Sequence, residues 1–235
     1  MQLEFDADAS PNAMAACIEQ NGVALIRGCY PVALIAQIAA ACDAYFAAQD
    51  AAVARGEQPP NRFRTIPLEA IAVEGVPAHS LLVTELVRAV AGACIGTAKP
   101  AAKRQSYVRC SHPTAPDLRL PYHQDGRVLL GGDLVNCWIP LVDCGREIPG
   151  LEVVVARVPG LEPTLPGEPQ ANYFRAGGME IDPDDVQRRY GPDRLWHPEF
   201  RAGDALIFLG TTIHRTHVAP GMSGGRLSID LRLTR

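Results

Sequence analysis

The chain has 235 residues, enough for one large domain, and its 47% hydrophobic and 20% charged residues are ordinary for a globular protein. A formal net charge of −4 argues against a nucleic-acid partner, which would require a basic face. Seven cysteines without a C-x-x-C pair indicate reduced thiols and a cytoplasmic location. An acidic N-terminus is wrong for a signal peptide, and no apolar run is expected to reach the about 18–20 residues of a membrane span.

Residues 1–98 are predicted to form a mainly helical layer that covers one face of a sheet. Apolar residues recur at helical spacing, and Ser10-Pro11 is typical of an N-cap followed by a first-turn proline. The predicted elements are a helix from Pro11 to Asn21, a strand at Val23–Ile26, a helix from Pro31 to before Gly56, and a helix from Ser80 to about Ala93.

Residues 99–235 have a different pattern, in which short alternating segments indicate strands. The predicted strands are Gln105–Cys110, Val135–Val142, Leu151–Val155, Ala205–Leu209 and Leu227–Leu233. Between them, residues from about 157 to 201 are irregular, with a short helix at Pro183–Tyr190, and are predicted to form a lid-like insertion. We therefore expect one α+β domain with a double-stranded β-helix core, a cupin-like jelly roll.

His123 and Asp125 lie two residues apart after a proline-rich loop. On an extended segment they would point to the same side, so an imidazole nitrogen and a carboxylate oxygen would converge. A second histidine from far along the chain, either His214 or His217, would complete a three-ligand face on a divalent metal. Two histidines and one carboxylate with open positions are typical of non-haem Fe(II) oxygenases.

Several motifs in order resemble the phytanoyl-CoA dioxygenase family of Fe(II)- and 2-oxoglutarate-dependent oxygenases. They are Tyr122-His123-Gln124-Asp125, Asn136–Leu141, Gly150–Val154, Gly203–Phe208 through His214, and Arg226-Leu227-Ser228. The resemblance implies that His123, Asp125 and His214 bind Fe(II), with 2-oxoglutarate and O₂ as co-reactants. It places His217 beside the site and not on the metal.

The resemblance also implies a cosubstrate pocket. Arg226, twelve positions after His214, would be a fourth catalytic group that holds the distal carboxylate of 2-oxoglutarate, since a guanidinium can donate two parallel hydrogen bonds. Thr216 is at the position where the family often places a hydroxyl on the same carboxylate. The further candidates for this pocket are Asn136, Trp138, Gln105 and Tyr107.

The expected activity is hydroxylation of a small molecule, with release of succinate and CO₂ and with neither a nucleic-acid nor a membrane partner. The chain has Val155–Val158 where many family members have Pro-Gly-Ser-His, so a coenzyme A thioester is not implied. The alternatives are a Zn²⁺-dependent hydrolase or isomerase on the same ligands, a cupin-like binding protein, and a non-catalytic oxygenase relative. The carboxylate of Asp125 disfavours halogenation. The sequence leaves the substrate and the oligomeric state open.

Overall fold

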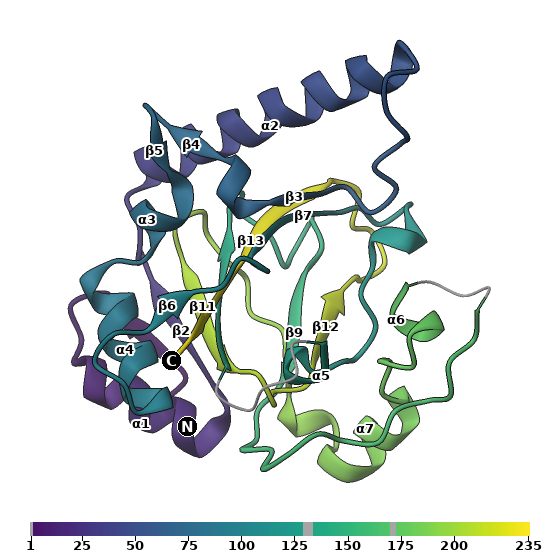
Figure 1. Cartoon of the computed structure of the whole chain (residues 1–235). Coiled ribbons are helices and arrows are strands. Elements are labelled where there is room, and N and C mark those ends of the chain that lie inside the picture. Colours follow the sequence, from purple (N-terminus) through teal and green to yellow (C-terminus); the bar gives the residue numbers. More distant parts are fainter. Residues whose placement is uncertain (1, 129–133, 170–172) are drawn as a thin grey trace.

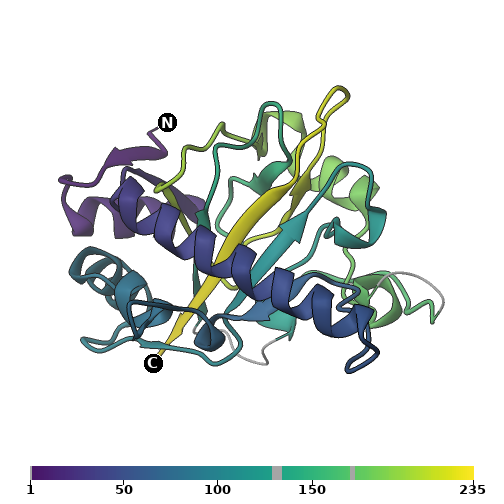
Figure 2. The same cartoon turned by 90° about the horizontal axis from the view of Figure 1, so that it is seen from above.

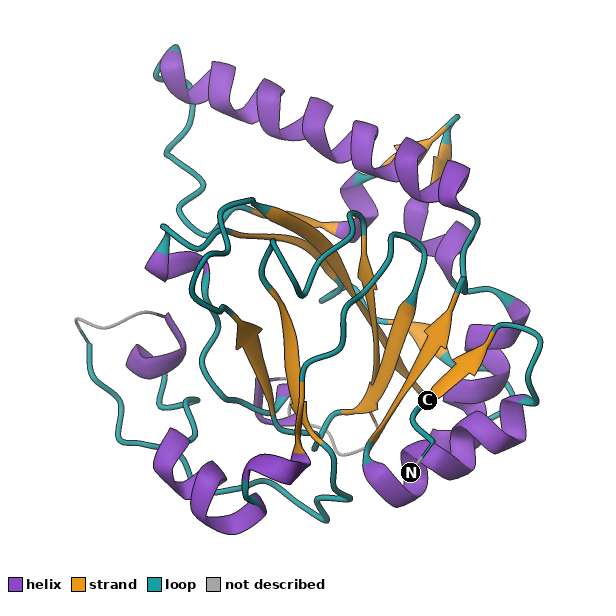
Figure 3. Ribbon diagram, turned by 180° about the vertical axis from the view of Figure 1, so that it is seen from behind, coloured by secondary structure: helices purple, strands orange, loops and turns teal. Residues whose placement is uncertain are grey.

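Two facing β-sheets form the core of the computed structural model, which describes residues 2–128, 134–169 and 173–235 (Figures 1 and 3). The strands are β1 Glu4–Asp6, β2 Val23–Arg27, β3 Thr65–Pro67, β4 Ala72–Val73, β5 Val76–Pro77, β6 Ala101–Ala102, β7 Tyr107–Ser111, β8 Leu134–Pro140, β9 Gly150–Val154, β10 Leu195–Trp196, β11 Ala205–Leu209, β12 His214–His217 and β13 Arg226–Thr234. The helices are α1 Pro11–Asn21, α2 Val32–Ala54, α3 Ala78–Leu82, α4 Glu85–Ile95, α5 Asp125–Val128, α6 Tyr173–Ala176 and α7 Pro183–Tyr190, with 3₁₀ turns at Leu68–Ala70, Pro116–Leu118 and Pro192–Arg194.

The large sheet has the strand order β1-β2-β11-β8-β13-β7-β3, with β6 also paired to β13, and the small sheet has the order β10-β9-β12. All neighbours pair antiparallel except β1 and β2. Leu151 and Val153 of β9 pack with Leu206 and Phe208 of β11 between the two sheets. The predicted α+β jelly roll is therefore confirmed.

Helices cover the outer face of the large sheet, as the sequence predicts. Helix α2 crosses over this face, and α1 and α4 lie beside it (Figures 1 and 2). Ile35 and Ile38 of α2 are buried against Ile229 and Leu231 of β13 in the largest apolar cluster. Side chains alternate along a strand, so the polar residues between these positions face the space between the sheets.

The sequence analysis predicts the third helix incorrectly and misses one strand. The third helix is two helices, because the chain turns at Val83 and restarts where the Thr84 hydroxyl accepts a hydrogen bond from the backbone N–H of Val87 at 3.2 Å. Ser10 is the N-cap residue of α1 and Pro11 its first residue, as predicted, although the Ser10 side chain makes no capping hydrogen bond. Strand β1 was not predicted, since three residues carry little periodic signal.

Helix α2 is long and apolar enough, by length and composition alone, to cross a membrane, with 23 residues and a mean hydropathy of 1.4 in its most apolar window. This overturns the expectation that no segment reaches that length. The evidence for a span is weak, because the same test is passed by a helix that packs on a protein core, and Ile35, Ile38, Cys42 and Phe46 of α2 do so.

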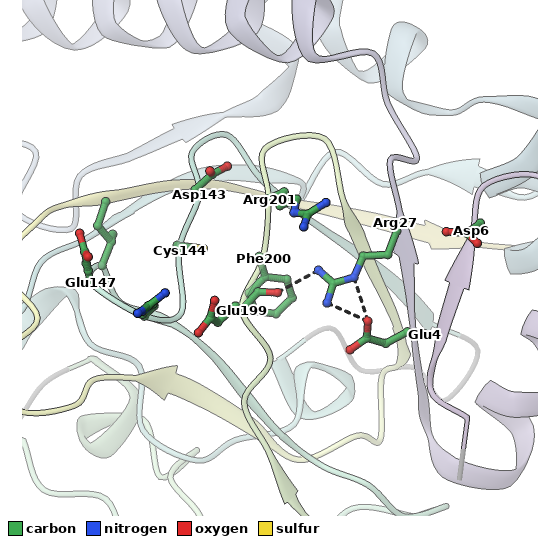
Figure 4. Close-up of a pocket in the computed structure, with 11 residues that line it drawn as sticks. Glu4, Asp6, Arg27, Asp143, Cys144, Glu147, Glu199, Phe200 and Arg201 are labelled. Carbon is green, nitrogen blue, oxygen red and sulfur yellow. Dashed lines mark hydrogen bonds and ion pairs between the residues drawn. The ribbon is translucent and has the colours of Figure 1, made fainter.

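The Gly203-Asp204 turn anchors β11 to the neighbouring loops. Gly203 has φ +96°, and a Cβ there would lie 2.6 Å from the carbonyl oxygen of Tyr30. The buried Asp204 carboxylate accepts hydrogen bonds from the backbone N–H groups of Gly28 and Arg201, at 3.0 and 2.9 Å, and pairs with Arg27 at 2.7 Å. Arg27 also lines a charged surface cleft of about 650 Å³ (Figure 4), none of whose lining residues is a predicted site residue.

We expect Asp204→Ala to lower the free energy of unfolding by about 2–3 kcal/mol, because it removes the acceptor of two backbone donors and the partner of Arg27. Urea unfolding followed by circular dichroism measures the change. Glu199→Ala, which removes an exposed carboxylate of the same cleft, is the control and should change stability by less than about 0.5 kcal/mol. Equal effects of the two substitutions would contradict this role of Asp204.

Candidate metal centre

His123 and His214 are joined through their backbones. The N–H of His123 donates to the carbonyl of His214 at 3.0 Å, and the N–H of His214 donates back at 3.1 Å. His214 begins β12, which pairs with β9, so the small sheet fixes both residues. The two imidazole rings lie with their centroids 4.2 Å apart.

Asp125 joins the histidines from a position that differs from the prediction. It begins the short helix α5, so the segment is not extended through Asp125. The backbone N–H of Gly126 donates to the carbonyl of Gly210 at 2.8 Å, and a Cβ on Gly126 would lie 3.0 Å from that oxygen. This close approach turns the chain and brings the carboxylate to the histidines.

The three side chains form a buried group whose possible ligand atoms all lie within 4.8 Å of one another. Nδ1 of His123 is 2.7 Å from the carbonyl oxygen of Pro121, and Nδ1 of His214 is 3.0 Å from that of Thr212. A carbonyl can only accept, so each Nδ1 carries the proton and each Nε2 is left for a metal. The structure thus brings His214, and not His217, beside His123 and Asp125.

Burial and charge favour the protonation states that a metal requires. Burial, and then the neighbouring His214, lower the pKa of His123 to about 3. Burial alone would raise the pKa of Asp125, but Arg232 and the two histidines outweigh it and lower that pKa. A neutral imidazole and an ionised carboxylate at neutral pH fit Fe(II).

Arg232 on β13 is a site residue that the sequence analysis missed. Its Nη2 lies 3.2 Å from each of the two carboxylate oxygens of Asp125, and both side chains are buried. The alternation in the last strand predicts a half-buried strand with Arg232 on its polar face, and it gave no sign that this face is buried or that Arg232 has a partner 107 positions earlier.

Arg226 lies on the same face of β13 and is buried. Its Nη1 donates to the backbone carbonyls of Pro149 and Gly150, and its guanidinium lies 5.2 Å from the centre of the Trp138 ring. Among the described residues no carboxylate pairs with Arg226, and its Nε has no hydrogen-bond partner.

Other polar atoms on this inner face are buried without a partner in the structure. They are the hydroxyls of Ser111 and Ser228 and both amide atoms of Asn136. Ser111 is the cross-strand neighbour of Arg226 on β7. Buried polar groups are normally hydrogen-bonded, so this set indicates a place for a polar ligand. The two serines were not predicted, since a serine in a strand is not distinctive by itself.

The other residues predicted for the cosubstrate pocket differ in burial and in the contacts that their side chains make. Asn136 and Trp138 lie on the inner face of β8, and Tyr107 is half-buried on β7. The Thr216 hydroxyl already accepts a hydrogen bond from the N–H of Leu120 at 3.0 Å. The side chain of Gln105 is exposed, so the structure does not bring it into this group; its backbone carbonyl instead accepts from Arg232.

The irregular segment, described at residues 157–169 and 173–201, packs against the segment that carries His123 and Asp125, beside β12 and α5 (Figure 1). The Phe174 ring lies edge-on to His123, with centroids 4.4 Å apart. The Gln124 amide donates to the carbonyl of Gly160 at 2.9 Å and accepts from the N–H of Glu162 at 2.7 Å. These contacts cover one side of His123 with an apolar ring.

A buried carboxylate, Glu152 on β9, links the residues that precede and follow the two histidine ligands. It accepts a hydrogen bond from the Tyr122 hydroxyl and lies 2.7 Å from Nε of Arg215. His217 is 3.7 Å from its other oxygen and stacks on His197.

This cluster also satisfies the spacing for a metal site, but its geometry does not favour one. The rings of His197 and His217 are parallel within 2° with centroids 4.1 Å apart, so their in-plane lone pairs cannot converge on one ion. We interpret the Glu152 cluster as a brace on the outer side of the histidine ligands.

Glu152 should contribute acid-sensitive stability. Burial alone would raise its pKa, but hydrogen bonds with His217, Tyr122 and Arg215 lower it from 4.5 to about 2. This stability is present above pH 4.5 and is lost as the pH falls toward about 2. We expect the loss of stability between pH 6 and pH 3.5 to be smaller by about 1–2 kcal/mol in Glu152→Gln than in the wild type, measured by urea unfolding. Glu147→Gln, at an exposed carboxylate, should keep the wild-type dependence, and identical pH profiles for all three proteins would refute the prediction.

Comparison with solved structures supports the same fold. AviO1 from Streptomyces viridochromogenes Tue57 is 16% identical with a TM-score of 0.59, and the match covers 96% of this chain and 95% of AviO1. The epimerase SnoN, solved with Fe³⁺, alpha ketoglutarate and nogalamycin RO, is 18% identical with a TM-score of 0.59, covering 95% and 83%. The carbocyclase SnoK from nogalamycin biosynthesis is 16% identical with a TM-score of 0.60, covering 98% and 86%.

Comparison with curated protein sequences gives no match. The family model described as phytanoyl-CoA dioxygenase (PhyH) matches residues 18–219, which is most of the chain and includes all three members of the metal triad. The family and the donor set together confirm the predicted cofactors, iron and 2-oxoglutarate. The chain therefore belongs to the phytanoyl-CoA dioxygenase family, as its motifs predicted.

Proposed function

We propose that the chain is an Fe(II)- and 2-oxoglutarate-dependent dioxygenase that hydroxylates a small-molecule substrate, with release of succinate and CO₂. The observation that carries this proposal is Arg226, a buried guanidinium on the inner face of the sheet without a carboxylate partner among the described residues. A buried, unpaired charge is costly, so a site that retains one is suited to a ligand of the opposite charge.

The groups around Arg226 favour a carboxylate as that ligand. Its unpartnered Nε and the hydroxyls of Ser111 and Ser228 can all donate hydrogen bonds. Trp138 provides a flat apolar wall beside the guanidinium. A dicarboxylate held here by one end would present its other end to the metal triad on the same inner space.

In this proposal the chain's residues bind, orient and exclude water. His123, Asp125 and His214 hold Fe(II) on one side and leave its other side open, and Arg226 anchors the distal carboxylate of 2-oxoglutarate. Phe174 and Phe208, whose rings lie 4.4 and 4.7 Å from His123 and His214, keep water from the histidines. The bound iron supplies O₂ activation, which couples decarboxylation of 2-oxoglutarate to oxidation of a substrate C–H bond.

Hydroxylation is the simplest outcome of that chemistry. Proteins with the same fold are described with other reactions, so the test must distinguish hydroxylation from epimerisation and ring formation. SnoN is described as an epimerase, solved in complex with nogalamycin RO, and SnoK is described as a carbocyclase. A product that gains one oxygen atom from ¹⁸O₂ supports hydroxylation. A product with altered stereochemistry or a new ring and no added oxygen would overturn that part of the proposal.

The binding test is an anaerobic titration of metal-free protein with Fe(II) and then 2-oxoglutarate. A visible charge-transfer absorption is expected in the wild type once both are bound. Asp125→Ala should lose the band because it loses a metal ligand. Arg226→Ala should still bind metal but need at least about 30-fold more 2-oxoglutarate, since it removes a buried charged partner of the carboxylate.

Arg157→Ala, which removes an exposed arginine, is the matched control and should titrate as the wild type does. Metal binding without a 2-oxoglutarate band in the wild type would overturn the proposed cosubstrate. Turnover with Zn²⁺ in the absence of O₂ and 2-oxoglutarate would instead support a hydrolase or isomerase.

A further inference from the structure

Arg232 is held in one position by two groups besides Asp125. Its Nη1 donates to the carbonyl of Gln105, and its backbone N–H donates to the Ser106 hydroxyl at 3.0 Å. That hydroxyl in turn donates to the carbonyl of Lys103 at 2.8 Å. Only 3% of the Arg232 side chain is exposed, so its guanidinium is fixed where it meets Asp125.

The contact is symmetric. Nη2 is 3.2 Å from both Oδ1 and Oδ2 of Asp125, so it lies over the middle of the edge between the two oxygens. A metal ion chelated by both oxygens of a carboxylate would occupy that same edge. When the guanidinium occupies this edge, each Asp125 oxygen keeps the lone pair that points away from Arg232. One of the two oxygens can then face the imidazoles of His123 and His214.

The buried charge of Asp125 also requires a balancing cation. Asp125 is buried, and both histidines beside it donate their Nδ1 protons to backbone carbonyls and not to the carboxylate. The other arginines on this inner face are otherwise engaged: Arg109 pairs with Asp230, and Arg226 lies against Pro149 and Gly150. Asp230 also lies 3.9 Å from Nη2 of Arg232, farther than the 3.2 Å to Asp125. Arg232 is the cation that balances Asp125 before a metal arrives.

We propose that Arg232 is a positioning residue that keeps Asp125 ready for the metal and restricts it to binding through one oxygen. Binding through one oxygen leaves about three of six coordination positions open, whereas chelation through two oxygens would leave about two. A bidentate 2-oxo acid and O₂ need three. This inference rests on the proposed function for its purpose, but the pairing itself can be tested without the cosubstrate.

The first test uses metal-free protein and a double-mutant cycle of Arg232→Met, Asp125→Asn and the double variant. Each single substitution leaves a buried charge without its partner, so we expect each to raise the unfolding equilibrium constant about 100-fold. If the two effects were independent, the double variant would raise the unfolding equilibrium constant by their product. We expect the increase in the double variant to be at least tenfold smaller than that product. Independent effects of the two substitutions would overturn the pairing.

The second test counts open positions on the metal by water-proton relaxation of Mn(II)-loaded protein. The wild type should show about one more exchangeable water than Arg232→Met, in which Asp125 is free to chelate. Arg232→Lys should restore the wild-type value in part, because an ammonium can occupy the same edge with fewer fixed contacts. A role that is only structural would change stability without changing the number of waters.

The matched control is Arg109→Met, which removes another arginine of the same face that pairs with Asp230 and not with Asp125. It should lower stability and leave the water count unchanged. An unchanged count in Arg232→Met, or an equal loss of water in Arg109→Met, would overturn the proposal. Failure of the proposed function would appear separately, as Mn(II) binding with normal water counts but no charge-transfer band with Fe(II) and 2-oxoglutarate.

Discussion

The alternation of side chains along β13 is the constraint on which the rest of the structure depends. Four aliphatic side chains between Leu227 and Leu233 pack toward the helical layer, and the polar residues between them face the space between the sheets. A shift of one residue in register would exchange the two faces and expose the aliphatic set. The apolar packing therefore fixes Arg226, Ser228, Asp230 and Arg232 in the interior at once.

Placing three arginines on one buried face is unfavourable unless each charge is balanced. Two of them are balanced within the chain: Arg109 pairs with Asp230, and Arg232 pairs with Asp125. Arg226 has only backbone carbonyls and the face of Trp138, and burial lowers its pKa. The fold thus tolerates one poorly compensated cation, which is the pattern expected where stability is given up for ligand binding.

The sequence was sufficient to predict features that depend on periodicity or on spacing. Strand β11 and helix α7 follow from such signals. The grouping of His123, Asp125 and His214 was also expected, but the extended segment that was to bring His123 and Asp125 together is not formed. Features that depend on one specific contact were not predictable. The chain turns back at Thr84 because one hydroxyl caps a new helix, and Asp125 starts a helical turn because two glycine backbones meet. The roles of His123, Asp125 and His214 as metal ligands, those of Arg226, Thr216 and the other predicted pocket residues, and the lid-like insertion at about 157–201 remain predictions.

The two histidines of the candidate metal centre are held by the sheet framework, whereas the ring that covers His123 is not part of it. His123 and His214 are bound to each other by backbone hydrogen bonds and braced from outside through Glu152. Phe174, in contrast, comes from the irregular segment between β9 and β10. The neighbouring structures share the fold at only 16–18% identity, so a common framework accommodates very different sequences. The segment that carries Phe174 thus touches the candidate metal centre without contributing to the large sheet, so it can change in sequence without disturbing that framework.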